Sequence, residues 1–243
     1  MNVKQLSEIL KGSNNIVFFG GAGMSTESGI SDFRSENGLY KTSQGFEYPP
    51  ETMLSHSFFE SHTAEFFKYY KEKMIFKNAL PNLGHKALAV LEEKGKLKAV
   101  VTQNIDGLHQ LAGSKKVYEL HGSIHRNYCT KCHKIYGLDY IVSSKDVPLC
   151  NVCRGIIKPD VVLYEETLDD DVVSSAVSAI KQADVMIIGG TSLVVYPAAG
   201  LINYFHGSKL VLINKSPTPY DSNADLVIND SVGKLLGTAV EML

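Results

Sequence analysis

The stretch Ile16–Gly29, "IVFFGGAGMSTESG", decides the fold class. It opens with the apolar run Ile16–Phe19, passes through Gly20–Gly23 and then becomes polar. This order predicts a buried strand, a tight glycine turn and the start of a helix. Such a turn offers backbone N–H groups to a phosphate. The dinucleotide fingerprint G-x-G-x-x-G would begin at Gly21 but has Thr26 at its third glycine, so a plain strand–helix turn remains the alternative.

Further apolar runs extend this pattern along the chain. They are continuous rather than alternating, as in a parallel sheet that is covered on both faces. Helical patterns over 82–94, 170–182 and 197–206 lie between them. Alternating strands and helices predict an α/β fold with a Rossmann-like, doubly wound parallel sheet. Its further strands are expected within 97–104, 116–122, 160–165, 183–192 and 208–216.

Two stretches interrupt the alternation and are expected to form a smaller lobe. Residues 35–75 are helical and aromatic in character, and residues 123–157 contain all four cysteines. The predicted organisation is therefore a Rossmann-like domain built from 1–34, 76–122 and 158–243, with a small lobe made of the helical insert 35–75 and a zinc ribbon over 123–157.

The cysteines are spaced C-x2-C, seventeen residues, C-x2-C, at Cys129, Cys132, Cys150 and Cys153. Two such pairs at this distance are typical of a zinc site. Disulfides or a redox pair are the alternatives, but a reducing cytoplasm disfavours the former. Four thiolates close a tetrahedral shell and leave no position for a reacting water, so one structural Zn²⁺ is predicted.

Composition limits the classes of partner. The 243 residues carry a net charge of −2, which gives no general attraction to nucleic acid or to an anionic membrane. No run approaches the ~18 apolar residues of a membrane span. The first fifteen residues, "MNVKQLSEILKGSNN", do not read as a signal peptide, and a cytoplasmic location is expected. Residues 123–158 hold six Lys/Arg and two Asp, a weak basic excess that keeps a zinc-ribbon nucleic-acid module only as an alternative.

Polar residues gather where the predicted strands end. Thr102, Gln103, Asn104 and Asp106 follow one strand with only Ile105 among them. Buried polar groups are costly without partners, so a ligand is expected opposite them. His121 ends the next strand, Thr191 and Ser192 follow a second glycine turn, and Asn214 ends the last strand. Carboxyl ends of parallel strands share one edge, which predicts a dinucleotide site there.

Six motifs in a fixed order resemble those of the sirtuins, a family of NAD-dependent protein deacylases, and its small bacterial members above all. They cover residues 15 to about 232 of the chain. The motifs are Gly21–Ser25, Gly29–Arg34, Thr102–Asp106, His121-Gly122, the four cysteines and Gly190–Leu193.

The resemblance implies an NAD-dependent protein lysine deacetylase. Acetyl-lysine, NAD and water would give lysine, nicotinamide and O-acetyl-ADP-ribose, with His121 as general base and with Asn104 and Asp106 also catalytic. Mono-ADP-ribosyl transfer from the same NAD site is the alternative. The implied NAD contacts are Ala22, Gly23, Thr26, Asp32, Phe33, Arg34, Gln103, Asn104, Ile105, Asp106, His121, Gly190, Thr191, Ser192, Asn214, Asp230 and Val232.

The implied partners are acetylated protein lysines, bound as an extended strand, with no membrane and no specific nucleic acid. The implied substrate contacts are Val161, Val162, Leu163, Tyr164 and Val194. Two departures from the family pattern concern the cofactor loop and peptide docking. Ser31 replaces the usual proline, and Tyr164–Glu166 replaces the usual Phe-Gly-Glu.

Overall fold

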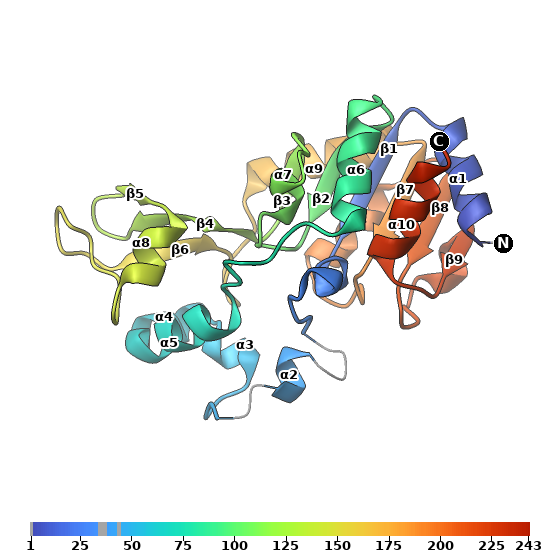
Figure 1. Ribbon diagram of the computed structural model, residues 1–243. Coiled ribbons are helices and arrows are strands. Elements are labelled where there is room, and N and C mark those ends of the chain that lie inside the picture. Colours follow the sequence, from blue (N-terminus) through green and yellow to red (C-terminus); the bar gives the residue numbers. More distant parts are fainter. Residues whose placement is uncertain (1, 34–37, 43–44) are drawn as a thin grey trace.

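A six-stranded parallel sheet forms the larger lobe of the computed structural model, which describes residues 2–33, 38–42 and 45–243 (Figure 1). The strand order is β3-β2-β1-β7-β8-β9, and every neighbouring pair is parallel. The chain winds outward in one direction from β1 and in the other from β7. The carboxyl ends of β1 and β7 therefore form the topological switch point where open α/β sheets bind ligands. The strands are β1 Ile16–Gly20, β2 Leu97–Thr102, β3 Val117–Glu119, β7 Val185–Gly189, β8 Lys209–Ile213 and β9 Leu226–Ile228.

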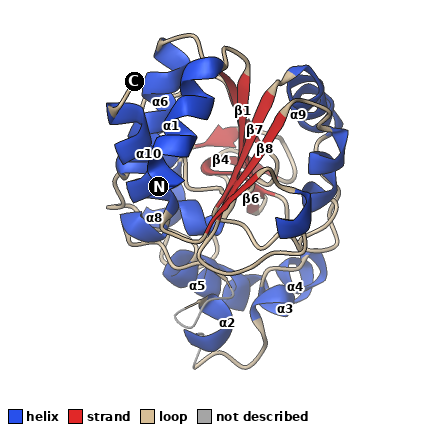
Figure 2. Ribbon diagram, turned by 90° about the vertical axis from the view of Figure 1, so that its right-hand side faces the viewer, coloured by secondary structure: helices blue, strands red, loops and turns tan. Residues whose placement is uncertain are grey.

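Helices cover both faces of this sheet, which explains the continuous apolar runs (Figure 2). On one face, α1 (Asn2–Gly12), α6 (Leu83–Glu93) and α10 (Val232–Glu241) pack in a single apolar cluster with the strands. On the other face, α9 (Asp170–Gln182) and the 3₁₀ helix η3 (Ala198–Tyr204) do the same. All five residues of β1 and of β7 are buried. The predicted α/β class with a parallel sheet is confirmed.

Side-chain caps set the start of two of these helices. The Asn82 side chain accepts bonds from Gly84 N at 2.9 Å and His85 N at 3.4 Å, while His85 Nδ1 accepts from Asn82 N at 3.3 Å, so α6 starts with a capping box. Asp169 caps α9 by accepting from Val172 N at 2.9 Å. Both helices lie where the sequence pattern predicts them.

The smaller lobe combines a short antiparallel sheet with helices (Figure 1). Its strands, in the order β5-β4-β6, are Ile135–Tyr136, Gly122–Cys129 and Ile157–Val161. One apolar cluster joins this sheet to the aromatic residues of the helical insert. The helices are α2 Leu39–Thr42, α3 Pro50–Met53, α4 His56–Ser61, α5 Thr63–Lys73 and α8 Leu138–Ser143. The division into 1–34, 76–122 and 158–243 against 35–75 and 123–157 stays a prediction.

The strand predicted within 160–165 does not join the parallel sheet. It is β6, which ends at Val161 and pairs antiparallel with β4, Gly122 facing Val161 and Cys129 facing Ile157. An apolar run says that a strand is buried but does not name its partner. The sixth strand of the main sheet is β9, whose three residues are too short for a periodic signal.

Two expected helices are 3₁₀ helices instead. After β1 the chain forms η1 (Ala22–Met24) and η2 (Thr26–Ser28), and the helix expected over 197–206 is η3. In the glycine turn, Met24 N bonds Gly21 O at 2.9 Å and Ser25 N bonds Ala22 O at 3.0 Å, the i to i−3 spacing of this helix type. Within the described ranges, no helix is both long enough and apolar enough to cross a membrane.

We predict that Gly84→Ala destabilises the larger lobe. A Cβ at Gly84 would lie 2.7 Å from Gly233 Cα, where α6 meets α10, and 2.8 Å from Met24 Cε. Overpacking of this kind costs roughly 1–3 kcal/mol, which should lower the melting temperature by several degrees in differential scanning calorimetry. Gly12→Ala is the matched control, because a Cβ at Gly12 meets nothing within 4 Å. A Gly84→Ala protein that melts at or above the wild-type temperature would contradict the packing argument.

Candidate active site

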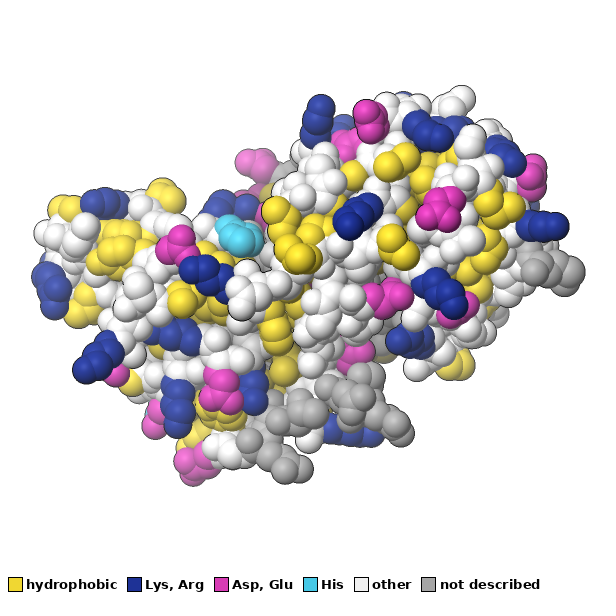
Figure 3. All heavy atoms as spheres, viewed as in Figure 1, with side chains coloured by type: hydrophobic (Ala, Val, Ile, Leu, Met, Phe, Trp, Pro, Cys, Tyr) yellow, Lys and Arg dark blue, Asp and Glu magenta, His cyan; other side chains and the backbone are white. Residues whose placement is uncertain are grey.

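A cavity of about 860 Å³ lies at the carboxyl ends of the parallel strands. Residues of both lobes line it, from the glycine turns on one side to the segment after β6 on the other. A volume of this order suits a small organic ligand. In the space-filling view the surface is hollowed between the two lobes (Figure 3).

Two glycine turns form the cavity wall at the switch point. Gly23 N donates to Gly190 O at 2.8 Å, and Gly21 N donates to Gly189 O at 3.2 Å. Gly190 has φ +63°, and a Cβ there would lie 2.3 Å from Met24 N, so only glycine fits. Thr26, which occupies the third position of the fingerprint, donates its hydroxyl to Gly23 O at 3.0 Å. The Thr26 hydroxyl therefore stabilises the turn at the position where the fingerprint has its third glycine. The turn residues Gly21, Ala22 and Gly23 line the cavity.

The polar residues after β2 form a hydrogen-bonded chain with Ser25. Asn104 Nδ2 donates to Ser25 Oγ at 3.0 Å, and Ser25 Oγ donates to Asp106 Oδ2 at 2.6 Å. Asp106 Oδ1 also accepts from Leu108 N at 2.9 Å, so it caps the short helix α7 (Leu108–Leu111) as well. Burial raises the pKa of the Asp106 carboxyl, and the bonds from Ser25 and Leu108 oppose that rise. These hydrogen bonds give the buried polar groups after β2 the partners that they need.

His121 is fixed by the same segment. Its Nδ1 lies 3.0 Å from Gln103 O, and because a carbonyl only accepts, Nδ1 carries the proton. The neutral ring then has Nε2 free to accept a proton. Burial lowers the pKa of His121, opposed by the bond to Gln103. A Cβ at the next residue, Gly122, would lie 2.0 Å from Asp160 O, so glycine is needed to bring β4 in beside β6.

The structure brings most of the predicted site residues to one cavity. Arg34 lies outside the described residues. Val194 does not line the cavity and is 47% exposed, although Val195 and Tyr196 beside it do line it. The predicted residues that line it are Ala22, Gly23, Thr26, Asp32, Phe33, Gln103, Asn104, Ile105, Asp106, His121, Val161, Val162, Leu163, Tyr164, Gly190, Thr191, Ser192, Asn214, Asp230 and Val232.

Sequence reasoning missed several lining residues. Ser25 belongs to the motif Gly21–Ser25, and that motif is the only signal in the sequence for its place at the cavity. Met74 and Phe76 line the cavity just after the C-terminal end of α5. Helical periodicity marks an apolar face but does not say that the cavity lies against it.

The four cysteines form one cluster away from the cavity. Their Sγ atoms lie within 4.8 Å of one another, and all four are free thiols. The closest sulfur pairs are Cys129–Cys153 at 3.4 Å and Cys132–Cys150 at 3.6 Å. Four soft ligands at these separations fit a tetrahedral Zn²⁺, and none of them lines the cavity.

Neighbouring donors prepare two of these sulfurs to act as thiolates. Cys129 Sγ accepts from the backbone N–H groups of Lys131 and Cys132 at 3.4 and 3.5 Å. Cys150 Sγ accepts from Tyr136 OH at 3.0 Å. Hydrogen bonds to a ligating sulfur orient it and stabilise its charge.

Comparison with known proteins identifies the family. Residues 21–197 match the model of the Sir2 family. This chain belongs to the Sir2 family. The resemblance to the sirtuins is thereby confirmed.

Relatives match this sirtuin over nearly its whole length. Proteins named NAD-dependent protein deacetylase from Clostridium acetobutylicum and Clostridium tetani are each 65% identical to it, covering 98% and 99% of this chain and 98% of each relative. A solved Sir2 variant with deacetylated p53 peptide and 3'-O-acetyl ADP-ribose has a TM-score of 0.90 at 43% identity, covering 100% of this chain and 98% of that one. A Sir2–p53 peptide–NAD⁺ complex has a TM-score of 0.87 at 44% identity, with the same coverage.

We predict that Cys150→Ala abolishes zinc retention and destabilises the small lobe of this sirtuin. Three ligands leave an open shell, and metal binding and folding are coupled in such modules. Zinc content by atomic absorption should fall well below one per chain, and the segment 123–157 should become sensitive to proteolysis. Tyr136→Phe is the matched control, because it removes the bond to Cys150 Sγ and keeps four thiolates. A Cys150→Ala protein with full zinc and unchanged protease resistance would show that the cluster is no metal site.

Proposed function

We propose that this sirtuin is an NAD-dependent protein lysine deacetylase that converts acetyl-lysine, NAD and water to lysine, nicotinamide and O-acetyl-ADP-ribose. The observation that carries the proposal is that His121, oriented by Gln103, lines the same cavity as the chain Asn104–Ser25–Asp106. The names of the relatives and the acetyl-ADP-ribose in a solved Sir2 structure support it.

The two glycine turns are proposed to hold the cofactor's phosphates. In the turn Gly21–Gly23, the N–H groups of Gly21 and Gly23 already donate to Gly189 O and Gly190 O, so Ala22 N–H is the one proposed to face a phosphate. Thr191 and Ser192 add hydroxyls at the second turn. Gln103 Nε2 donates to Thr191 Oγ1 at 3.1 Å, which links the strand-end cluster to that turn. Asn214, Asp230 and Val232 line the cavity beyond β8. When bound, NAD supplies the ADP-ribosyl group that accepts the acetyl group as nicotinamide leaves.

Asn104 and Asp106 are proposed to orient the nicotinamide half of NAD. Their bonds to Ser25, at 3.0 and 2.6 Å, fix both side chains before any ligand arrives. Such preorganisation lowers the barrier by removing the entropy cost of alignment. Ser25 is therefore proposed as a positioning residue that acts through its two neighbours.

His121 is proposed as the general base. The lowered pKa keeps the ring neutral near pH 7, and Nδ1–H on Gln103 O leaves Nε2 to accept a proton. That proton would come from a ribose hydroxyl, which then attacks the acyl carbon. Because the pKa is lowered, this function is retained above the titration of His121 and is lost as the pH falls through it.

The acetylated peptide is proposed to bind as a strand beside Val161–Tyr164. β6 stands at the end of its sheet, with β4 on one side, so the peptide would add on the other side, where Leu163 N already donates to Glu166 Oε2 at 2.9 Å. Val161, Val162 and Leu163 line the cavity. Main-chain pairing would supply most of the affinity.

The alternatives have less support. Mono-ADP-ribosyl transfer would use the same NAD site, but it has no need of a base such as His121 late in the reaction. A nucleic-acid role for the zinc ribbon is disfavoured by the net charge of −2 and by the mixture of acidic and basic side chains on the face in Figure 3. A cytoplasmic location is proposed, since four free thiols in one cluster suit a reducing compartment.

Incubation with NAD and an acetyl-lysine peptide tests the function. Mass spectrometry should detect deacetylated peptide, free nicotinamide and O-acetyl-ADP-ribose in equal amounts. A reaction without NAD is the control. ADP-ribose attached to the peptide, with the acetyl group still present, would instead establish the transferase.

We predict that His121→Ala separates the two halves of the reaction. Nicotinamide cleavage uses the amide oxygen of acetyl-lysine, which has no proton to lose, whereas the next step needs a base. Deacetylation should fall by roughly 10²–10⁴-fold, the usual contribution of a general base. Exchange of labelled nicotinamide into NAD, measured with peptide present, should fall much less.

Asn104→Ala serves as the comparison, since its proposed role precedes the first bond cleavage. Exchange and deacetylation should fall together in that protein. Equal losses of both activities in His121→Ala would contradict the role of His121 as a late base.

A further inference from the structure

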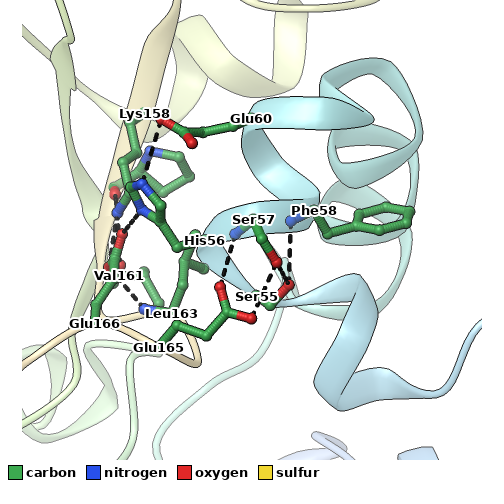
Figure 4. Close-up of polar contacts among 11 residues, drawn as sticks. Ser55, His56, Ser57, Phe58, Glu60, Lys158, Val161, Leu163, Glu165 and Glu166 are labelled. Carbon is green, nitrogen blue, oxygen red and sulfur yellow. Dashed lines mark hydrogen bonds and ion pairs between the residues drawn. The ribbon is translucent and has the colours of Figure 1, made fainter.

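The C-terminal end of the proposed docking strand Val161–Tyr164 is bound to the start of helix α4 (Figure 4). Tyr164 N donates to Leu54 O at 3.0 Å, and His56 N donates to Tyr164 O at 3.0 Å. The two segments thus run side by side as an isolated parallel bridge between Ser55 and Tyr164. Residues more than a hundred positions apart in sequence hold this edge of the cavity together.

Glu165 is a second connection between the segments. It has φ +77°, a left-handed conformation that costs a residue with a side chain about 1 kcal/mol or more. Its carboxylate accepts from both Ser57 N at 2.9 Å and Ser57 Oγ at 3.0 Å (Figure 4). The negative charge of Glu165 at the N-terminus of α4 also interacts favourably with the helix dipole. These bonds explain why glutamate is tolerated where the family pattern has glycine.

Glu166 connects the docking strand itself to His56. Its Oε2 accepts from Leu163 N at 2.9 Å and from Lys158 Nζ at 3.1 Å, while Oε1 accepts from His56 Nδ1 at 2.8 Å. Lys158 is buried and also donates to Val161 O at 3.0 Å. One carboxylate therefore gathers donors from β6, from the segment that follows β6 and from α4 (Figure 4).

We propose that His56 is a positioning residue for peptide binding, which acts through Glu166 to hold Leu163–Glu166 in the conformation that receives the acetylated peptide. The proposal rests on the deacetylase function proposed above. When His56 is protonated, its bond to Glu166 joins two charges, and such bonds are roughly twice as strong as neutral ones. Protonation of His56 should therefore tighten peptide binding and lower KM, while kcat stays the same because His56 does not line the cavity.

The charges around His56 favour its protonated form. Glu166 lies on one side, and Glu60 Oε1 lies 3.4 Å from its Nε2. The positive charge of Lys158 in β6 opposes the protonation of His56. Lys158 Nζ also lies 5.9 Å from the ring centre of Tyr128. The bond to Glu166 is the main cause that raises the pKa of His56. Burial raises the pKa of Glu166, but its bonds to Leu163, His56 and Lys158 outweigh this and lower it.

The sign of the pH effect follows from this direction. A raised pKa means that the charged bond is fully present below the ordinary histidine range. It is lost as the pH rises through the raised pKa of His56. Peptide KM should therefore increase with pH in the wild-type protein over and above any change that His121 or NAD binding causes.

Four proteins compared from pH 6 to pH 9 test the proposal. His56→Asn places an amide N–H near the position of Nδ1 and cannot titrate, whereas His56→Ala removes the donor. At pH 6, His56→Ala should raise the KM for an acetyl-lysine peptide by roughly three- to tenfold with kcat kept, as expected when the competent conformation is less populated. The ratio of wild-type KM to His56→Asn KM should rise with pH. His206→Ala, which removes an exposed histidine elsewhere, should match the wild type throughout.

The results separate the deacetylase function from the positioning role of His56. If the wild type shows no NAD-dependent deacetylation at any pH, the proposed function is wrong. If the wild type is active but all four proteins share one KM profile with pH, or if kcat alone changes in His56→Ala, His56 has no positioning role.

Discussion

The close contact between two backbone turns governs this structure. Gly23 and Gly190 meet at the switch point of the sheet, where Gly23 N donates to Gly190 O at 2.8 Å and where a Cβ at either glycine would overlap backbone of the other turn. Because β1 and β7 are neighbours in the sheet, this contact fixes how their carboxyl ends open. A side chain at either position would separate the two turns and enlarge the distance between them and the cluster after β2.

Polar groups at the cavity are mutually satisfied, which keeps their desolvation cost low. Ser25 Oγ accepts a hydrogen bond from Asn104 and donates one to Asp106. The backbone carbonyl of Gln103 accepts from His121, and its side-chain amide donates to Thr191. Each of these side chains is thereby held in one orientation. A site of this kind needs little reorganisation when ligand binds, which is what chemistry at a sugar carbon requires.

The small lobe contributes rigidity at a second place. The apolar cluster that includes Phe58, Phe66 and Tyr70 also contains Cys129, Cys150 and Val161, so the cysteine cluster, the helical insert and β6 share one core. The bonds of Glu165 and Glu166 to α4 extend that core to the cavity edge. We therefore expect loss of metal to affect the cavity through this packing, although no cysteine lines the cavity.

Local signals in the sequence were enough for the parts that depend on neighbours in the chain. Apolar runs located most of the parallel strands, and the helical patterns over 82–94 and 170–182 located α6 and α9 almost to the residue. The spacing of the four cysteines predicted their gathering into one cluster. The order of the motifs named the family, because six coincidences in sequence are improbable.

Only the tertiary structure decided what depends on partners far along the chain. The run at 160–165 gave a buried strand, but its pairing with β4 depends on the turn and cluster that join them. β9 is recognised as a strand through its bonds to β8, since three residues carry no period. Ser25 lies 81 positions from Asp106, and His56 lies 110 positions from Glu166. Hydrogen bonds between such residues leave no periodic trace in a single sequence, because they follow from how the completed sheets bring chain segments together.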